Sequence, residues 1–171
     1  ITAGIRYTYD KRDIDATRIT YNGNTDVTTT TTYGPEKRSF DKLTWRLSID
    51  HRFSPELMAY ASYNRGFRSG TFVPQIATPF NVLEPEVVDA YELGIKTDLF
   101  DRKVRLNVAG YYYDQSAVQV IQVIAGVNNV YNARQGARIY GIDADMTWQV
   151  SDNMRLFGGF NWTDARYRDF T

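Results

Sequence analysis

The sequence from position 42 to 53 reads Lys42-Leu43-Thr44-Trp45-Arg46-Leu47-Ser48-Ile49-Asp50-His51-Arg52-Phe53. Its odd positions are apolar or aromatic apart from His51, and its even positions are charged or hydroxylated. Successive side chains of a β-strand point to opposite faces, whereas a helix would scatter these charges around its circumference. The pattern therefore predicts one long strand with an apolar face and a polar face.

The same alternation recurs along the chain and is weakest after position 57, where Met58 and Tyr60 interrupt it. These segments are longer than the roughly 5–6 residues of a usual soluble strand, and they match the roughly 9–11 residues of a membrane-spanning one. Seven strands are predicted, at Ile1–Tyr9, Lys42–Phe53, Leu57–Arg68, Val87–Leu99, Val104–Asp114, Arg138–Val150 and Met154–Tyr167.

The links between these segments alternate in length. Positions 54–56, 100–103 and 151–153 are short turns, and positions 10–41, 69–86 and about 115–133 are long links. In an up-and-down meander the short turns fall on one rim and the long loops on the other, as in outer-membrane barrels. The first long link contains Thr28–Thr32, and we expect a polar surface loop there, with room for a short hairpin of its own.

The composition narrows the possible functions. With 20 basic and 20 acidic residues among 171, the chain lacks the positive charge of a nucleic-acid binder. It has no cysteine and one histidine, which disfavours metal sites and histidine-based catalysis. The longest apolar run, Leu57–Ala61, is too short for a membrane helix. An aromatic content of 15% suits an outer-membrane barrel, in which polar and apolar residues alternate.

The predicted faces indicate an all-β, antiparallel up-and-down transmembrane β-barrel, here a fragment of about seven strands within a single barrel domain spanning 1–171. A Lys or Arg on the lipid face at the bilayer midplane would cost about 2–4 kcal/mol, so charges belong on the lumenal face. Aromatic girdles are expected near strand ends, at Phe53, Phe100 and Trp148 on one side and Tyr7, Tyr9, Phe67, Tyr112 and Trp162 on the other. The predicted lumenal charges are Arg46, Asp50, Glu92, Lys96, Arg105, Asp143, Asp145 and Arg155.

Two pairs of carboxylates invite a chemical interpretation, and each pair has a simpler one. Glu92 is expected to pair with Lys96 or Arg105 rather than to act with Glu86 as a glycosidase pair. Asp143 and Asp145 share a face, but we expect them to pair with Arg155 on the next strand rather than to hold a cation. No enzyme activity, cofactor or metal site is therefore predicted.

Three stretches resemble the TonB-dependent outer-membrane receptors, which import siderophores, cobalamin or other nutrients. The first is Tyr60-Ala-Ser-Tyr-Asn-Arg-Gly-Phe-Arg68. The second runs from Leu83 to Asp114 and includes Tyr91-Glu-Leu-Gly-Ile-Lys96. The third is Ile139-Tyr-Gly-Ile-Asp-Ala-Asp145 with the later Asn161-Trp-Thr-Asp-Ala165. The family often has glutamate where Asp143 stands.

The resemblance implies a place in the C-terminal half of a barrel of about 22 strands with a plugged lumen. The plug, the TonB-contacting segment and the final strand are expected to lie outside residues 1–171. Implied partners are outer-membrane lipid, the TonB complex through the missing plug domain, and a small-molecule ligand such as a metal chelate, in the outer membrane of a Gram-negative bacterium.

Arg65, Arg68 and Phe72 stand where a strand meets an outer loop, and Tyr131 lies at an aromatic loop tip. Cationic and aromatic groups there could contact an anionic chelate, so these four are predicted ligand contacts. The alternative is an aromatic girdle with arginines paired to lipid phosphate. Two other functions stay open at this point: a small passive outer-membrane barrel and a soluble all-β binding module.

Overall fold

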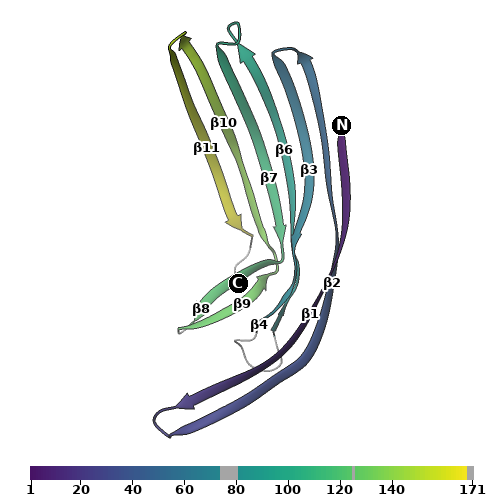
Figure 1. Ribbon diagram of the computed structural model, residues 1–171, viewed down its shortest axis with the longest axis vertical. Coiled ribbons are helices and arrows are strands. Elements are labelled where there is room, and N and C mark those ends of the chain that lie inside the picture. The colour runs from purple at the N-terminus through teal and green to yellow at the C-terminus, as the bar shows by residue number, and fades with distance from the viewer. Residues whose placement is uncertain (74–80, 125, 169–171) are drawn as a thin grey trace.

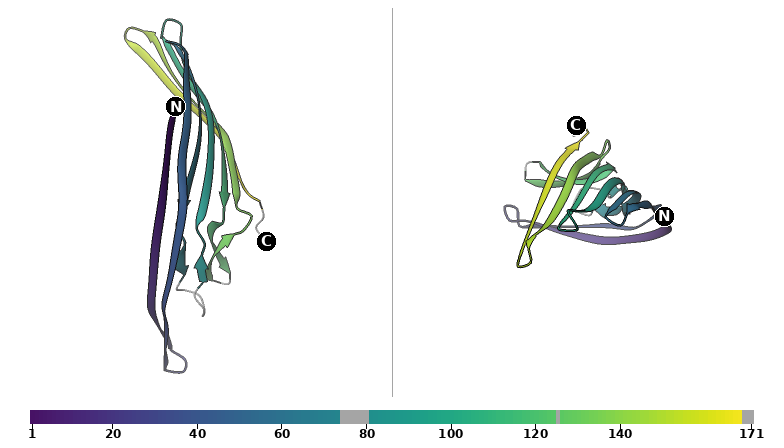
Figure 2. Two further views of the ribbon diagram at one scale, coloured as in Figure 1. Left: turned by 90° about the vertical axis from the view of Figure 1, so that its right-hand side faces the viewer. Right: turned by 90° about the horizontal axis from the view of Figure 1, so that it is seen from above.

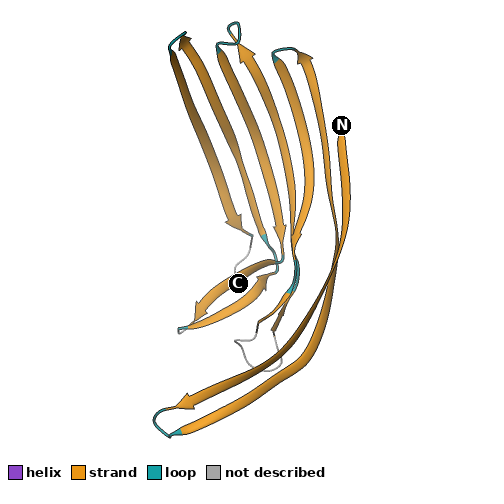
Figure 3. Cartoon of the chain, in the orientation of Figure 1, coloured by secondary structure: helices purple, strands orange, loops and turns teal. Residues whose placement is uncertain are grey.

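The structure is a computed structural model that describes residues 1–73, 81–124 and 126–168. These residues form strands and turns without a helix (Figure 3), and no helix among them is long and apolar enough to cross a membrane. The strands are β1 (Thr2–Asn22), β2 (Val27–Ser54), β3 (Leu57–Arg68), β4 (Thr71–Val73), β5 (Asn81–Leu83), β6 (Glu86–Leu99), β7 (Val104–Ser116), β8 (Val118–Ile124), β9 (Val127–Ala133), β10 (Ala137–Ser151) and β11 (Met154–Tyr167).

Seven of these strands form one antiparallel sheet in the order β1-β2-β3-β6-β7-β10-β11, which confirms the predicted meander. The sheet is curved and open, as the view from above shows (Figure 2). Its three short turns lie together at one end, at the top of Figure 1, and we call this the short-turn end. Hairpins β4–β5 and β8–β9 and the tip of β1–β2 lie at the other, long-loop end.

The first predicted loop is wrong in its extent. The β1–β2 ladder extends from Thr2 opposite Ser48 to Asn22 opposite Val27, with one register shift between Ile14 and Ala16. Threonine is β-branched and favours extended backbone, so Thr28–Thr32 continues the strand. The apolar alternation stops there because the side chains of Thr28–Thr32 are largely exposed on both faces.

Residues in register across the sheet share a face, and the two faces differ in polarity. One row on the apolar face joins Ile49, Ala61, Leu93, Gly110, Ile142 and Trp162. Leu43, Leu47 and Ile49 in β2 are exposed by 47%, 51% and 53%, and Leu93 in β6 by 66%. No helix or second layer among the described residues covers this face.

The buried side chains lie elsewhere. The buried apolar residues among the described positions are all at the long-loop end: Tyr33, Phe40, Phe72, Val73, Leu83, Val118, Val120, Ala133 and Ala137. The chain exposes 12083 Å², whereas a compact soluble monomer of its 19.7 kDa exposes about 8,600 Å². The structure is therefore a single-layered sheet, and its exposed apolar face is stable only against an apolar medium.

Two rows mark the edge of that apolar band. The tyrosine row, Tyr63, Tyr91, Tyr112 and Tyr140, crosses four adjacent strands. The charged row, Arg65, Asp89, Asp114, Arg138 and Arg166, lies two residues further toward the long-loop end on the same face. From Tyr140 to Val150, ten steps of about 3.3 Å at a tilt of about 40° cover roughly 25 Å, the height of a barrel's lipid-facing band.

Candidate functional site

Arg65 lies on the apolar face, in the charged row. Its Nε and Nη2 donate to the two carboxylate oxygens of Asp89, at 2.7 and 2.5 Å. The hydroxyl of Tyr63 donates to the same carboxylate at 2.8 Å, and the guanidinium carbon lies 4.5 Å from the ring centre of Trp45. Arg65 thus has a complete set of partners beside the tyrosine row, which favours the girdle alternative over ligand contact for this residue.

The other three predicted ligand contacts lie at the long-loop end in different surroundings. Arg68 is exposed, on the polar face, opposite Glu86. Phe72 is 9% exposed and packs with Tyr33, so its ring supports the loops from within. Tyr131 is half-buried on hairpin β8–β9, where its hydroxyl lies 3.3 Å from Oε1 of Gln122.

The polar face carries all eight predicted lumenal charges. In register across the sheet, Arg46 shares a row with Asn64 and Tyr113, Asp50 with Tyr60 and Asp143, and Lys96 with Asn107 and Asp145. The pairs Glu92–Tyr111, Asp98–Arg105 and Gln149–Arg155 lie on the same face.

Their partners differ from those expected. Glu92 accepts a 2.6 Å hydrogen bond from Tyr60 rather than pairing with a cation, and Arg105 binds Asp98 at 2.8 Å. The Lys96 ammonium lies 5.7 Å from the centre of the Tyr60 ring. The reason for this difference is register, which sets cross-strand neighbours and is not given by alternation.

The predicted pairing of Asp143 and Asp145 with Arg155 is also wrong. Arg155 donates to Gln149, directly opposite it, at 2.9 Å. Asp145 accepts from Asn107 at 2.7 Å. Asp143 makes no hydrogen bond or ion pair with any described residue. Because Asp143 stands opposite Asn161 and Asp145 opposite Gly159, Arg155 lies too far along its strand to reach them.

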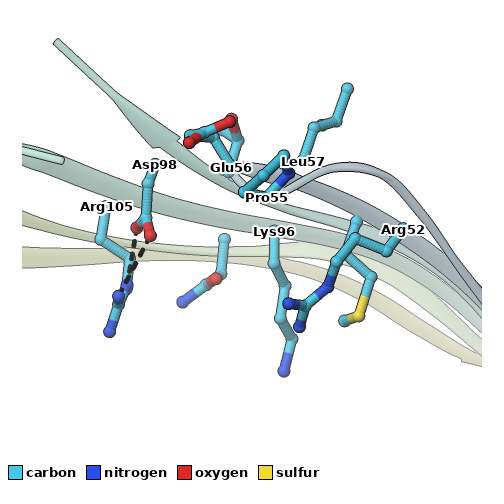
Figure 4. Close-up of a pocket in the computed structure, with 10 residues that line it drawn as sticks. Arg52, Pro55, Glu56, Leu57, Lys96, Asp98 and Arg105 are labelled. Carbon is cyan, nitrogen blue, oxygen red and sulfur yellow. Dashed lines mark hydrogen bonds and ion pairs between the residues drawn. The ribbon is translucent and has the colours of Figure 1, made fainter. Parts of the chain in front are cut away.

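A shallow cavity of about 320 Å³ opens on the polar face near the short-turn end. Arg52, Lys96 and Arg105 extend from one side of the sheet there (Figure 4). A larger one, of about 480 Å³, lies over the middle strands between Tyr60 and Asn161. Within the described ranges, no group of three or more His, Cys, Asp or Glu side chains is arranged to hold a metal ion.

Polar contacts at the long-loop end join β1 to the segment around β4. Asp10 and Arg12 of β1 form a 3.1 Å ion pair, and Arg12 also donates to the Thr71 hydroxyl at 3.2 Å. The neighbouring Ser69 hydroxyl and the Arg12 guanidinium lower the pKa of the Asp10 carboxyl. Sequence reasoning missed the Arg12–Thr71 contact because it joins segments far apart in the chain.

A curved antiparallel sheet with long tilted strands, an exposed apolar band, tyrosines at its edge and a charged opposite face is the wall of a transmembrane β-barrel. The family model described as TonB dependent receptor-like, beta-barrel matches residues 1–171. The chain therefore belongs to the β-barrel family of TonB-dependent receptors, which reside in the outer membrane of Gram-negative bacteria. In a barrel of this family the apolar face is expected to meet lipid, the polar face to line the lumen, and the long loops to lie at the outer end.

Relatives share this wall at low identity. The chain is 24% identical over 163 residues to the metal-pseudopaline receptor CntO of Pseudomonas aeruginosa, covering 95% of this chain and 21% of that protein. The ferric yersiniabactin uptake receptor FyuA of Yersinia pestis superposes with a TM-score of 0.70 and 17% identity over 96% of this chain and 24% of its own. The copper transporter OprC gives 0.73 and 14%, over 94% and 26%. The chain thus spans about a fifth to a quarter of these proteins.

Proposed function

We propose that residues 1–171 form part of the barrel wall and outer loops of a receptor that takes up a metal chelate, such as an iron–siderophore complex. The remaining strands and a plug domain, on which the TonB complex acts, lie elsewhere in the same protein. CntO is a metal-pseudopaline receptor, FyuA a ferric yersiniabactin uptake receptor and OprC a copper transporter, which supports a metal-bearing ligand. In this proposal the segment performs no bond chemistry and needs no cofactor.

One observation carries the proposal: the two ends of the sheet are built differently. At the short-turn end the strands are joined by tight turns, such as Pro55–Glu56. At the outer end the chain builds a long hairpin extension and two further hairpins, and it buries its apolar side chains there. Ordered outer loops with their own packed clusters suit ligand capture, since binding residues commonly lie on loops that a rigid scaffold positions.

Within these loops we propose Arg68 and Tyr131 as ligand contacts. Arg68 is exposed on the lumenal face at the outer end, where its guanidinium can pair with an anionic chelate. Tyr131 offers a ring and a hydroxyl on hairpin β8–β9. We propose a structural role for Phe72, and for Arg65 the anchoring role given by its Asp89 partner.

Uptake by the full-length protein tests this function. A strain lacking the gene is supplied with radioactive iron or copper as hydroxamate, catecholate or opine-type chelates, with and without a functional TonB. The proposal expects uptake of at least one chelate that needs both the gene and TonB. Arg68→Ala should weaken chelate binding by roughly tenfold, as loss of a charge-assisted contact does, whereas Arg65→Ala should not.

A passive barrel is the second candidate function. The observation that favours it is that the polar, lumenal face carries cavities open to solvent. A passive barrel would give uptake that is independent of TonB and rises linearly with chelate concentration. Saturable, TonB-dependent uptake excludes it, and a plug of more than a hundred residues upstream, as expected for a receptor, would agree with that result.

A further inference from the structure

We propose that the side chains of Gln119 and Asn132 tie hairpin β8–β9 to the neighbouring outer segment, so that the outer loops move as one body. That segment, the β4–β5 segment, comprises the described residues Ser69–Val73 and 81–86. The idea deepens the proposed function, because this body would be the ligand-facing wall. The coupling itself is a property of the unliganded protein and is tested without ligand.

Asn132 of β9 pairs with the peptide of Glu84 as a neighbouring strand would. Its Oδ1 accepts the Glu84 N–H at 2.9 Å, and its Nδ2 donates to the Glu84 carbonyl at 3.0 Å and to the Ala117 carbonyl at 2.7 Å. Pro85 follows Glu84. The proline ring restricts Glu84 to extended backbone, and Pro85 itself has no N–H to donate. A side-chain amide, which both donates and accepts, matches this isolated peptide.

Gln119 of β8 stands directly opposite Asn132 in the hairpin ladder. Its Nε2 donates to the carbonyls of Ser69 and Glu84, both at 3.1 Å. Its backbone N–H donates to the carboxylate of Glu86 at 3.1 Å. Gln119 therefore contacts both ends of the β4–β5 segment: Ser69, which precedes β4, and Glu84 and Glu86, which follow β5.

A third tie lies nearer the hairpin tip, where Asn81 Nδ2 donates to the Val130 carbonyl at 2.6 Å. These contacts accompany a buried cluster of Val118, Val120, Ala133 and Ala137 at the base of the hairpin. Because β8–β9 forms a two-stranded sheet of its own, separate from the main sheet, side chains rather than strand pairing hold it to its neighbours.

The β4–β5 segment is joined to the β1–β2 extension on its other side. Arg12 donates to Thr71, Phe72 packs against Tyr33, and the ring of Phe40 lies so close to Gly70 that a Cβ there would come within 2.5 Å of it. The three outer loops are thus connected in sequence, β1–β2 to β4–β5 to β8–β9. A connected wall loses less freedom when a ligand binds, which is the benefit of preorganisation.

Hydrogen exchange on the full-length receptor in detergent tests the coupling. The variant Asn132→Asp/Gln119→Glu keeps side-chain size but removes the Nδ2 and Nε2 donors. Asn128→Asp is the matched control, since Asn128 lies exposed in the same strand and its side chain hydrogen-bonds to no other described residue. The amides of Thr71–Val73 and Asn81–Leu83 are read, because none of them bonds directly to the altered side chains.

The proposal expects exchange of those amides to accelerate about tenfold in the double variant and to stay unchanged in Asn128→Asp. Unchanged exchange in a folded double variant would overturn it. If the double variant fails to insert, the single variants are compared by the distance distribution between spin labels at Thr28 and Ile121, both exposed. Broadening in Asn132→Asp and not in Asn128→Asp supports the coupling, and equal distributions overturn it.

Discussion

Arg65 and Asp89 form a two-pronged ion pair on the lipid-facing side of the barrel, in register across β3 and β6. The pair lies about 7 Å beyond the stacked rings of Tyr63 and Tyr91, two residue steps along the strands, and those ring centres are 4.6 Å apart. This set of partners supports the proposed anchoring role of Arg65 at the membrane boundary over contact with a ligand.

Arg65→Ala should lower the free energy of unfolding by about 1–2 kcal/mol, because it leaves a half-buried carboxylate without its partner. Arg65→Ala/Asp89→Ala should cost less than the two single changes added together. Urea titration of the full-length receptor in lipid measures both. A loss of chelate affinity with unchanged stability would assign Arg65 to the ligand site instead.

Gly94 gives Tyr60 room to lie across the lumenal face. A Cβ on Gly94 would lie 2.5 Å from the Tyr60 ring, and that ring is held by its 2.6 Å hydrogen bond to Glu92. Gly94→Ala should therefore destabilise the barrel by about 1–3 kcal/mol. Gly66→Ala is the control, since nothing lies within 4 Å of that position.

The clash on Gly94 also predicts a rescue. Adding Tyr60→Ser to Gly94→Ala should recover much of the lost stability, because the ring that collides with the new methyl group is gone. An additive loss in the double variant would contradict this account of Tyr60. The same urea titration measures the stability of the single and double variants.

Ile95 should tolerate no charge. It is 43% exposed on the apolar face and shares a row with Ala144, four of the ten steps from Tyr140 to Val150. Ile95→Arg near the bilayer midplane should therefore cost about 2–4 kcal/mol. Phe157, 86% exposed on the lumenal face, is the comparison, and Phe157→Arg should cost less than about 1 kcal/mol because the new charge meets water. Equal costs at the two positions would deny the assignment of faces.

Alternation in the sequence predicts the membrane strands closely, since the ends of β3 and β11 agree with the prediction to the residue. It succeeds because a wall between lipid and water enforces period two on every strand. The same rule fails for Thr28–Thr32, where exposure on both faces removes the signal. Arg65 stands two positions after Tyr63 in the same predicted strand, so alternation alone places both side chains on the lipid face.

The rest of the site depends on register and on contacts between distant segments. Arg155 contacts Gln149 rather than Asp145 because of the register between β10 and β11, which no local sequence pattern encodes. The contacts of Gln119 and Asn132 with the β4–β5 segment join residues more than thirty positions apart. Polar residues in long loops give no periodicity from which such partners could be inferred.

The most direct measurement follows spin-label accessibility along β2, in a full-length receptor reconstituted into a bilayer. Residues 1–171 contain no cysteine, so single cysteines can be placed at Arg46, Leu47, Ser48, Ile49 and Asp50 without a competing thiol in this segment. We predict that oxygen, which partitions into lipid, reaches labels at Leu47 and Ile49 best, and that a water-soluble nickel complex reaches those at Arg46, Ser48 and Asp50 best. A flat profile, or nickel maxima at Leu47 and Ile49, would contradict the barrel wall and the uptake function built on it.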